Sequence, residues 1–212
     1  MMCMGFPRNV GFYERFLTMA DLEPTELARW KYWYQFFLRK LTYKYERPLV
    51  LKSPANTSRI NVLLELFPQA KFVHICRNPY DVLRSAKHTL VTAGPWWQLQ
   101  QTAYSDDAMN QQLIRQMKIL YDNYFMQRAL IPLGRLHEVA FEDLERDPVG
   151  QLRLIYQALQ LPDFSYVERP LTAYLTTIAD YKKNVLEPLP DALQKQVHRE
   201  CRRCFDEWGY AA

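Results

Sequence analysis

The chain has 212 residues, of which 49% are apolar and 24% are charged, values typical of a globular protein with a substantial core. The 27 Lys and Arg residues only slightly outnumber the 23 Asp and Glu residues, and a net charge of +4 argues against a nucleic-acid-binding protein. The 6 glycines form no glycine-rich nucleotide fingerprint, and the sequence predicts no membrane span.

The first half of the chain predicts helices interrupted by two short strands. Pro24 suits the first turn of a long helix, and Asn78 suits the cap of a later one, just before Pro79. The run "LVLKS" predicts a buried strand that ends on Lys52, and "KFVHIC" predicts a second strand. The predicted helices are 10–20, 24–46, 57–67 and 79–92, and the predicted strands are 49–53 and 71–76.

The second half predicts one more strand between longer helices. The motif "AGPWWQ" indicates a loop, because glycine and proline punctuate regular structure. The stretch from 165 to 190 is rich in Pro and Tyr, which predicts partly irregular structure. The predicted elements are a loop at 93–104, a helix at about 105–130, a strand at 135–141, a turn and helix within 142–159, and a closing helix at 191–208.

Short strands that alternate with longer helices predict an α/β fold. The expected architecture is a parallel sheet of three strands, covered by helices on both faces. The sequence contains no linker, internal repeat or low-complexity tract, so we expect a single domain over residues 1–212.

Cations follow two of the predicted strands, Lys52 after "LVL" and Arg77 after "FVHIC". In open parallel sheets, ligands bind beyond the carboxyl ends of the strands, and a helix N-terminus attracts anions. The planar guanidinium of Arg77 matches a phosphate or sulfate, and Ser85, two turns into the next helix, could add a hydroxyl donor. The alternative is structural: Arg77 could cap a carbonyl or pair with Asp81.

Residues 49–89, "LVLKSPANTSRINVLLELFPQAKFVHICRNPYDVLRSAKHT", resemble sulfotransferases that use 3′-phosphoadenosine 5′-phosphosulfate (PAPS). The shared pattern is strand, Lys-Ser-Pro, helix, Phe-Pro, strand, Arg-Asn-Pro, and a Ser eight residues after the Arg. Residues 140–162 and 181–210 resemble two later segments of the same family. The resemblance implies a sulfotransferase fold of the P-loop-nucleotide-hydrolase-like kind.

The resemblance assigns residues to the donor nucleotide. Arg77 and Ser85 would hold its 3′-phosphate, and Phe141, where the family usually has Tyr, would contact the adenine. Lys182, Lys183 and Asn184 would close over the nucleotide.

The same resemblance places Lys52 beside the transferred sulfuryl group, where it would neutralise charge on the bridging oxygen. Many relatives carry His at the position of Asn56, which could orient an acceptor hydroxyl but could not act as a base. Neither His74, within a strand, nor His88, on a helix, is assigned as the base. No metal is required for this chemistry.

The chain departs from the family at its N-terminal end. The strand and the Pro-Arg-Ser-Gly-Thr-Thr type of loop that cradle the 5′-phosphosulfate are missing, and Arg8 in "FPRN" does not replace them. We therefore expect an N-terminally incomplete sulfotransferase fold, whose activity as this chain alone is doubtful.

Other motifs have alternative interpretations. His198, Cys201 and Cys204 could ligate a metal, although the pattern favours a helix face with two small thiols. The aromatic run "WKYWYQFFLRKLTYKY" predicts a core helix rather than a nucleic-acid surface, with an acceptor-binding wall as a further option. The tryptophans of "GPWWQ" are stronger candidates for that wall.

Three functions follow from these observations. The first is sulfuryl transfer from PAPS to a hydroxyl or amine of a small-molecule or carbohydrate acceptor, with no nucleic-acid partner. The second is a non-catalytic remnant that binds the 3′-phosphoadenosine nucleotide or a protein partner. The third, a small-molecule kinase, is opposed by the missing glycine-rich loop. The start "MMCMGFPRN" shows no leader, which favours the cytoplasm.

Overall fold

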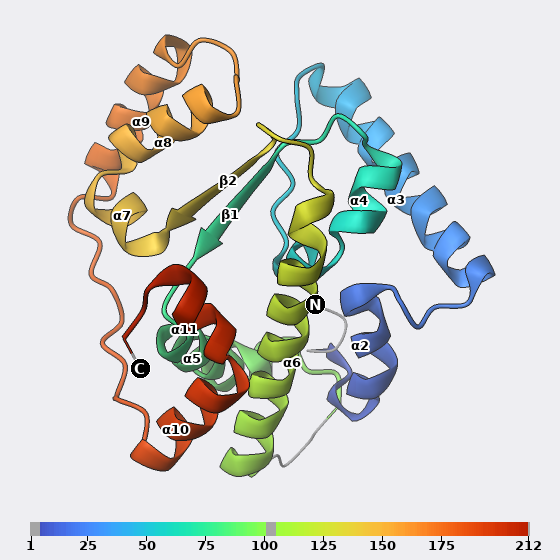
Figure 1. Ribbon diagram of the computed structural model, residues 1–212, viewed down its shortest axis with the longest axis vertical. Helices are drawn as coiled ribbons and strands as arrows, with labels where there is room; N and C mark the ends of the chain where they lie inside the picture. The colour runs from blue at the N-terminus through green and yellow to red at the C-terminus, as the bar shows by residue number, and fades with distance from the viewer. Residues whose placement is uncertain (1–4, 101–104, 212) are drawn as a thin grey trace. The chain divides into compact units, whose positions relative to one another are not determined.

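The computed structural model describes residues 5–100 and 105–211. These residues divide between two units, the first formed by Met1–Ala70 with Ala93–Leu130 and the second by Lys71–Thr92 with Ile131–Ala212. The described part of the first unit is helical, and the second unit contains a small parallel sheet with helices (Figure 1). Among the described helices, none has both the length and the apolar character that a membrane span requires.

The predicted helices of the first unit are present, with small shifts at their ends. The first turn of α3 is stabilised as its sequence suggests, because Pro24 opens the helix and the Glu26 carboxylate accepts the Glu23 backbone N–H at 3.2 Å. The elements are η1 (Pro7–Asn9), α2 (Val10–Thr18), α3 (Pro24–Tyr45), η2 (Pro54–Ser58), α4 (Ile60–Leu66), α6 (Asp106–Gln127) and η3 (Arg128–Leu130).

The core of the first unit contains apolar side chains from α2, α3 and α4. Met19, Leu22 and Val62 are buried, and Trp30 packs against them from α3. A fully buried serine, Ser58, joins η2 to α2 by donating its hydroxyl to the Leu17 carbonyl at 2.6 Å. Burial of this polar group is offset by that hydrogen bond.

The helix α3 is not the core helix that the sequence predicts. Only one side of it packs inward, with Leu38 buried and Trp30 half-buried, whereas Trp33 and Phe37 are 54% and 56% exposed. The apolar positions cover more of the helix circumference than the unit can bury. The prediction that its aromatics share one core face is therefore wrong.

The predicted strand at 49–53 is also wrong. The structure has no regular element between the end of α3 and η2, and Val50 is 97% exposed. A strand needs a neighbour to accept and donate its backbone hydrogen bonds, and the described part of the first unit contains no other strand. Prolines at 48 and 54 also bracket the segment and remove two backbone donors.

The second unit contains a two-stranded parallel sheet, not the three strands expected. The strands are β1 (Phe72–Cys76) and β2 (Leu136–Ala140), paired in register from Phe72↔Leu136 to Cys76↔Ala140. Figure 1 shows the two arrows side by side and pointing in the same direction. The α/β class with a parallel sheet is confirmed, and the sheet is smaller because the 49–53 segment does not join it.

Helices follow both strands of the second unit. Val139 on β2 packs with Ile155 and Leu159 of α8 to form one buried cluster. The helices are α5 (Pro79–Trp97), whose residues from Ala93 on belong to the first unit, α7 (Phe141–Arg146), α8 (Pro148–Ala158), α9 (Ser165–Thr177), α10 (Asp191–Glu200) and α11 (Arg202–Trp208). The last two replace a single predicted helix, which is interrupted at Cys201, while residues 178–190 contain no helix or strand, as expected for the latter part of 165–190.

The predicted loop at 93–104 is helical in its first part, because α5 continues to Trp97. The ring of Pro95 leaves the carbonyl of Val91 without its usual N–H donor, and Val91 is 53% exposed, so water can supply one. The backbone N–H of Gln98 donates to Gly94 at 2.9 Å and completes the last turn. The final four residues of the predicted loop, 101–104, lie outside the described residues.

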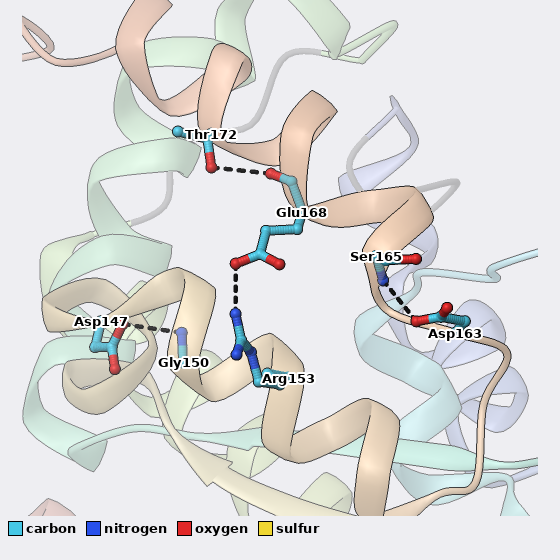
Figure 2. Close-up of polar contacts among 7 residues, drawn as sticks. All are labelled: Asp147, Gly150, Arg153, Asp163, Ser165, Glu168 and Thr172. Atoms are coloured by element: carbon cyan, nitrogen blue, oxygen red, sulfur yellow. Dashed lines mark hydrogen bonds and ion pairs between the residues drawn. The ribbon is translucent and has the colours of Figure 1, made fainter.

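Polar contacts stabilise α8 and α9 (Figure 2). The Asp147 side chain accepts the Gly150 N–H at 2.9 Å and caps α8, and Arg153 forms an ion pair with Glu168 between the two helices. Asp163 accepts the N–H of Ser165 at 2.9 Å, and this hydrogen bond lowers the pKa of the Asp163 carboxyl. These contacts are structural, and they leave Arg153 compensated.

Candidate functional site

The strand register brings Arg77 and Phe141 together. Cys76 and Ala140 are paired at the ends of β1 and β2, and Arg77 and Phe141 are the residues that directly follow the two strands. Because the strands are parallel, both side chains lie at the carboxyl edge of the sheet. The Arg77 guanidinium carbon lies 4.2 Å from the centre of the Phe141 ring, which is a cation–π contact.

Arg77 has no polar partner among the described residues. Its Nε is buried without a hydrogen bond, and no ion pair involves its guanidinium. The structural alternative in which Arg77 pairs with Asp81 is wrong, because Asp81 pairs with Arg84 instead. A buried donor without a partner is costly unless a ligand satisfies it, so Arg77 is suited to an anion.

Ser85 lies in the same unit, on α5, which begins two residues after Arg77. Asn78 caps this helix as expected, with its Oδ1 accepting the Tyr80 N–H at 2.9 Å. Ser85 is half-buried, and its backbone carbonyl accepts the Thr89 hydroxyl at 2.9 Å. The Ser85 hydroxyl itself makes no hydrogen bond to a described residue, so it remains available as a donor.

The segment 181–190 is irregular and is attached to the second unit by specific contacts. Lys183 Nζ lies 2.5 Å from Glu145, and Asn184 Nδ2 lies 3.3 Å from His88 Nε2. Arg84 donates to the Leu186 carbonyl at 3.2 Å. The charge of Lys183 is thus compensated within the protein, in contrast to the charge of Lys182.

Lys182 is exposed and forms no ion pair with a described residue. Of the two lysines that the resemblance assigns to the nucleotide, Lys182 is therefore the one whose charge is available to a ligand without breaking an existing pair.

Two C-terminal aromatic residues contact the carboxylates on either side of Phe141. Trp208 Nε1 donates to Glu138 at 3.3 Å, and the Tyr210 hydroxyl donates to Glu142 at 2.8 Å. Burial raises the pKa of Tyr210, and the bond to Glu142 raises it further. Sequence reasoning missed this support, since an aromatic residue after a closing helix carries no signal of its partner.

The described core of the second unit also holds Cys76 at the end of β1. Its Sγ lies 3.4 Å from the Val139 carbonyl, and burial raises the pKa of the thiol. Cys76 is thus a neutral, packed side chain beneath the site, as the sequence predicts for a cysteine in an apolar strand.

Lys52 and Asn56 lie in the first unit. Lys52 is exposed and has no ion pair with a described residue. Asn56 lies in η2, where its Nδ2 donates to the Leu51 carbonyl at 3.4 Å and its backbone N–H donates to Ser53 at 3.0 Å. These bonds fold the chain around Lys52 into a turn, so Asn56 has a local structural role in addition to its predicted one.

The remaining motifs do not form a second site. Cys201 and Cys204 are buried free thiols, His198 packs edge-on against Phe205 with ring centres 5.1 Å apart, and no group of three metal-ligating side chains occurs in 5–100 and 105–211. A cavity of about 420 Å³ between α8 and α9 is lined by Arg153, whose charge Glu168 already compensates.

The tryptophans proposed for an acceptor wall are on the last turn of α5. Trp96 is 86% exposed and Trp97 is 49% exposed. Their exposure is compatible with an acceptor contact, and that role stays a prediction.

Comparison with known proteins places these residues in context. Residues 5–165 match the model of a family described as the sulfotransferase family. The chain is 37% identical over 207 residues to proteins named omega-hydroxy-beta-dihydromenaquinone-9 sulfotransferase Stf3 from Mycobacterium bovis and from Mycobacterium tuberculosis. The match covers 98% of this chain and 53% of each relative, so the chain spans about half the length of the curated relatives it matches. No solved structure matches the chain significantly.

Proposed function

The chain belongs to the sulfotransferase family, and on this basis we propose that it moves a sulfuryl group from PAPS to a hydroxyl group. The observation that carries the proposal is Arg77, which stacks on Phe141 at the sheet edge with a buried and unpartnered Nε. A guanidinium in this state is suited to an anion, and the donor nucleotide would supply one as its 3′-phosphate.

The second unit holds the proposed nucleotide-binding residues. Arg77 and the free hydroxyl of Ser85 bind the 3′-phosphate, and Phe141 contacts the adenine ring. The segment from Lys182 to Asn184 covers the nucleotide, with Lys182 contributing the uncompensated charge. The half-buried position of Phe141 and the contacts of 181–190 with the unit support these roles.

The proposed roles of Lys52 and Asn56 concern the transfer step. The bond between sulfur and the phosphate oxygen breaks while a bond to the acceptor oxygen forms, and the acceptor hydroxyl loses its proton. Negative charge grows on the departing phosphate, where the Lys52 ammonium stabilises it. Asn56 orients the acceptor hydroxyl, but its amide cannot take the proton at neutral pH, so the base is another group.

The acceptor we propose is an apolar molecule with a free hydroxyl. The two relatives are named for an omega-hydroxylated menaquinone, which has this chemistry. The exposed Trp96 and Trp97 are suited to an apolar acceptor, because indole rings offer a large contact area at low conformational cost.

Calorimetry with adenosine 3′,5′-bisphosphate tests the nucleotide site. We expect Arg77→Ala to weaken binding by about 1.5–3 kcal/mol, the range for a hydrogen bond to a charged group. The matched control is Arg146→Ala, which removes the same charge from a side chain of the second unit that is 78% exposed. Equal affinity of wild type and Arg77→Ala would remove Arg77 from the site.

A transfer assay separates the enzyme from the non-catalytic remnant. Radiolabelled sulfuryl should move from PAPS to a hydroxylated isoprenoid quinone. Nucleotide binding without any transfer would favour the remnant, and absence of both would contradict the proposal.

A further inference from the structure

The helix α3 has a second apolar face, whose side chains are exposed in the described chain. Its inner side contributes Leu27, Trp30 and Leu38 to the core or its edge. A second set of large side chains lies at positions 32, 33, 36, 40 and 43, and steps of three or four residues link them along one side of the helix. The stripe comprises Tyr32, Trp33, Phe36, Lys40 and Tyr43, and we call it the outer stripe.

The four aromatic side chains of the outer stripe are exposed, and three of them, Tyr32, Trp33 and Phe36, contact one another. Tyr32, Trp33 and Tyr43 are 60%, 54% and 88% exposed, and Phe36 is 39% exposed. Tyr32 and Phe36 lie parallel with ring centres 6.3 Å apart, and Trp33 meets Phe36 edge-on at 5.5 Å. A cluster of aromatic rings that faces water is typical of an interaction site.

The charges around the outer stripe have one sign. Between Leu27 and Tyr45 the helix carries five Lys or Arg residues and no Asp or Glu. Lys40 lies between Phe36 and Tyr43 in the stripe, with its Nζ 4.6 Å from the Phe36 ring centre, and Lys44 Nζ lies 5.3 Å from the Tyr45 ring centre. Neither lysine forms an ion pair with a described residue, so both charges are available to an anionic partner.

We propose that the outer stripe of α3 docks on the surface of a bilayer that contains anionic phospholipids. Tyr and Trp favour the interface between water and lipid, where the ring is partly buried and its polar atom stays hydrated. Lysines beside such rings bind lipid phosphates, and basic residues near an anionic membrane each add to the affinity. An interfacial helix of this kind combines an aromatic face with Lys and Arg.

The composition of the stripe favours a membrane over a protein partner. The central parts of protein interfaces are depleted in lysine, whereas this surface includes Lys40 between Phe36 and Tyr43. The inference goes beyond the proposed reaction and does not require it, because docking concerns α3 alone and can be measured without donor or acceptor.

Vesicle flotation tests the proposal with the 212-residue chain. The chain should float with vesicles of phosphatidylcholine and phosphatidylglycerol, and much less with phosphatidylcholine alone. The double variant Lys40→Glu, Lys44→Glu should lose roughly tenfold or more of its partition coefficient, since each basic residue at such a surface contributes about fivefold. A higher salt concentration should also weaken the binding of the wild-type chain to the anionic vesicles.

Matched variants isolate the stripe from general effects of charge and apolar surface. Arg169→Glu with Lys195→Glu changes the charge equally at exposed, unpaired positions of the second unit and should leave flotation unchanged. Phe36→Ser with Tyr43→Ser should reduce flotation at least fivefold, whereas Tyr166→Ser with Tyr174→Ser, two tyrosines that are 80% and 59% exposed, should not. Circular dichroism spectra equal to wild type confirm that each variant is folded.

Three results would overturn the proposal. The first is no flotation with anionic vesicles. The second is flotation that the α3 variants do not change. The third is no flotation together with an association that Phe36→Ser and Tyr43→Ser abolish, either self-association or binding to single-stranded oligonucleotide, because the stripe would then belong to a second copy or to nucleic acid.

Discussion

The two regions that carry the predicted site residues hold them by different means. In the second unit, two hydrogen-bonded strands end at Cys76 and Ala140, and their register delivers Arg77 and Phe141 to one edge at 4.2 Å. In the first unit, Lys52 lies on an exposed segment without a strand, and two hydrogen bonds from Asn56 to the backbone, at 3.4 Å and 3.0 Å, form the turn around it. A paired strand fixes the residue that follows it, whereas a turn between prolines positions a side chain much less firmly.

The difference also appears in the charges. Arg77 is partly desolvated and has an orphaned donor, while Lys52 is hydrated. A desolvated cation attracts an anion strongly as soon as the ligand is bound. A hydrated cation stabilises an anion most in the transition state, when water is excluded and negative charge develops. We therefore expect Arg77 to affect affinity and Lys52 to affect rate.

The largest expected effects test whether the two units differ in stability. Ile60 in the first unit and Leu159 in the second are 2% and 1% exposed, so replacing either by Ala should cost about 2–5 kcal/mol of unfolding free energy. If the units unfold separately, each variant shifts a different transition in calorimetry. Leu133→Ala, at a fully exposed position, is the control. Equal shifts of one shared transition would favour the single domain over 1–212.

The next prediction tests the contrast between the charges of Arg77 and Lys52. Lys52→Ala should lower the transfer rate roughly 100-fold, as expected for loss of one charge-stabilising donor, while nucleotide affinity changes little. Single-turnover kinetics and calorimetry measure the two quantities, and Lys195→Ala is the control because Lys195 is exposed and has no ion pair with a described residue. A loss of affinity as large as the loss of rate would contradict the assigned role.

A smaller effect tests the strand-end pair directly. In a double-mutant cycle of Arg77→Ala and Phe141→Ala, the two residues should couple by about 0.5–1 kcal/mol in nucleotide binding. Arg153 and Phe164 form a similar contact at 5.4 Å and should show no coupling in the same assay. Additive losses at Arg77 and Phe141 would mean that the stacking has no part in binding.

The smallest effect concerns pH. Burial and the bond to Glu142 raise the pKa of Tyr210 above its unfolded value of 10.0, so the folded state keeps a proton that the unfolded state releases. The contribution of Tyr210 to the free energy of unfolding should be fully present below pH 10 and should decrease as the pH rises above 10. In chemical denaturation, the free energy of unfolding of Tyr210→Phe should decrease less steeply with pH than that of the wild type. Identical slopes for the two proteins would show that Tyr210 does not cause the decrease.

The sequence predicted those parts of the fold in which local pattern and tertiary context agree. The strand at 71–76 was found because its apolar run is flanked by a turn and a capped helix, and β2 supplies its neighbour. The run at 49–53 has a similar composition, but three apolar residues cannot specify whether a partner strand exists. Pairing is a property of the whole unit and cannot be read from the segment.

The site was predicted to a similar extent. Arg77 was predicted as an anion ligand from its place after a strand, and Phe141 was predicted from a resemblance, and the register explains why they meet. The pairing of Lys183 with Glu145, about 40 positions apart in the chain, and the support from Tyr210 depend on contacts that no sequence spacing encodes. The aromatic residues of α3 were predicted to be core because periodicity reports an apolar face without reporting what covers it.

The described free cysteines, Cys76, Cys201 and Cys204, are all buried and all belong to the second unit. The rate at which a thiol reagent labels these cysteines during stepwise denaturation can therefore report the unfolding of that unit, provided that Cys3 is first replaced by Ser. Mass spectrometry would read the label at each cysteine without any engineered probe. The nucleotide should slow this labelling. The labelling would report the second unit alone, because the first unit has no other thiol among its described residues.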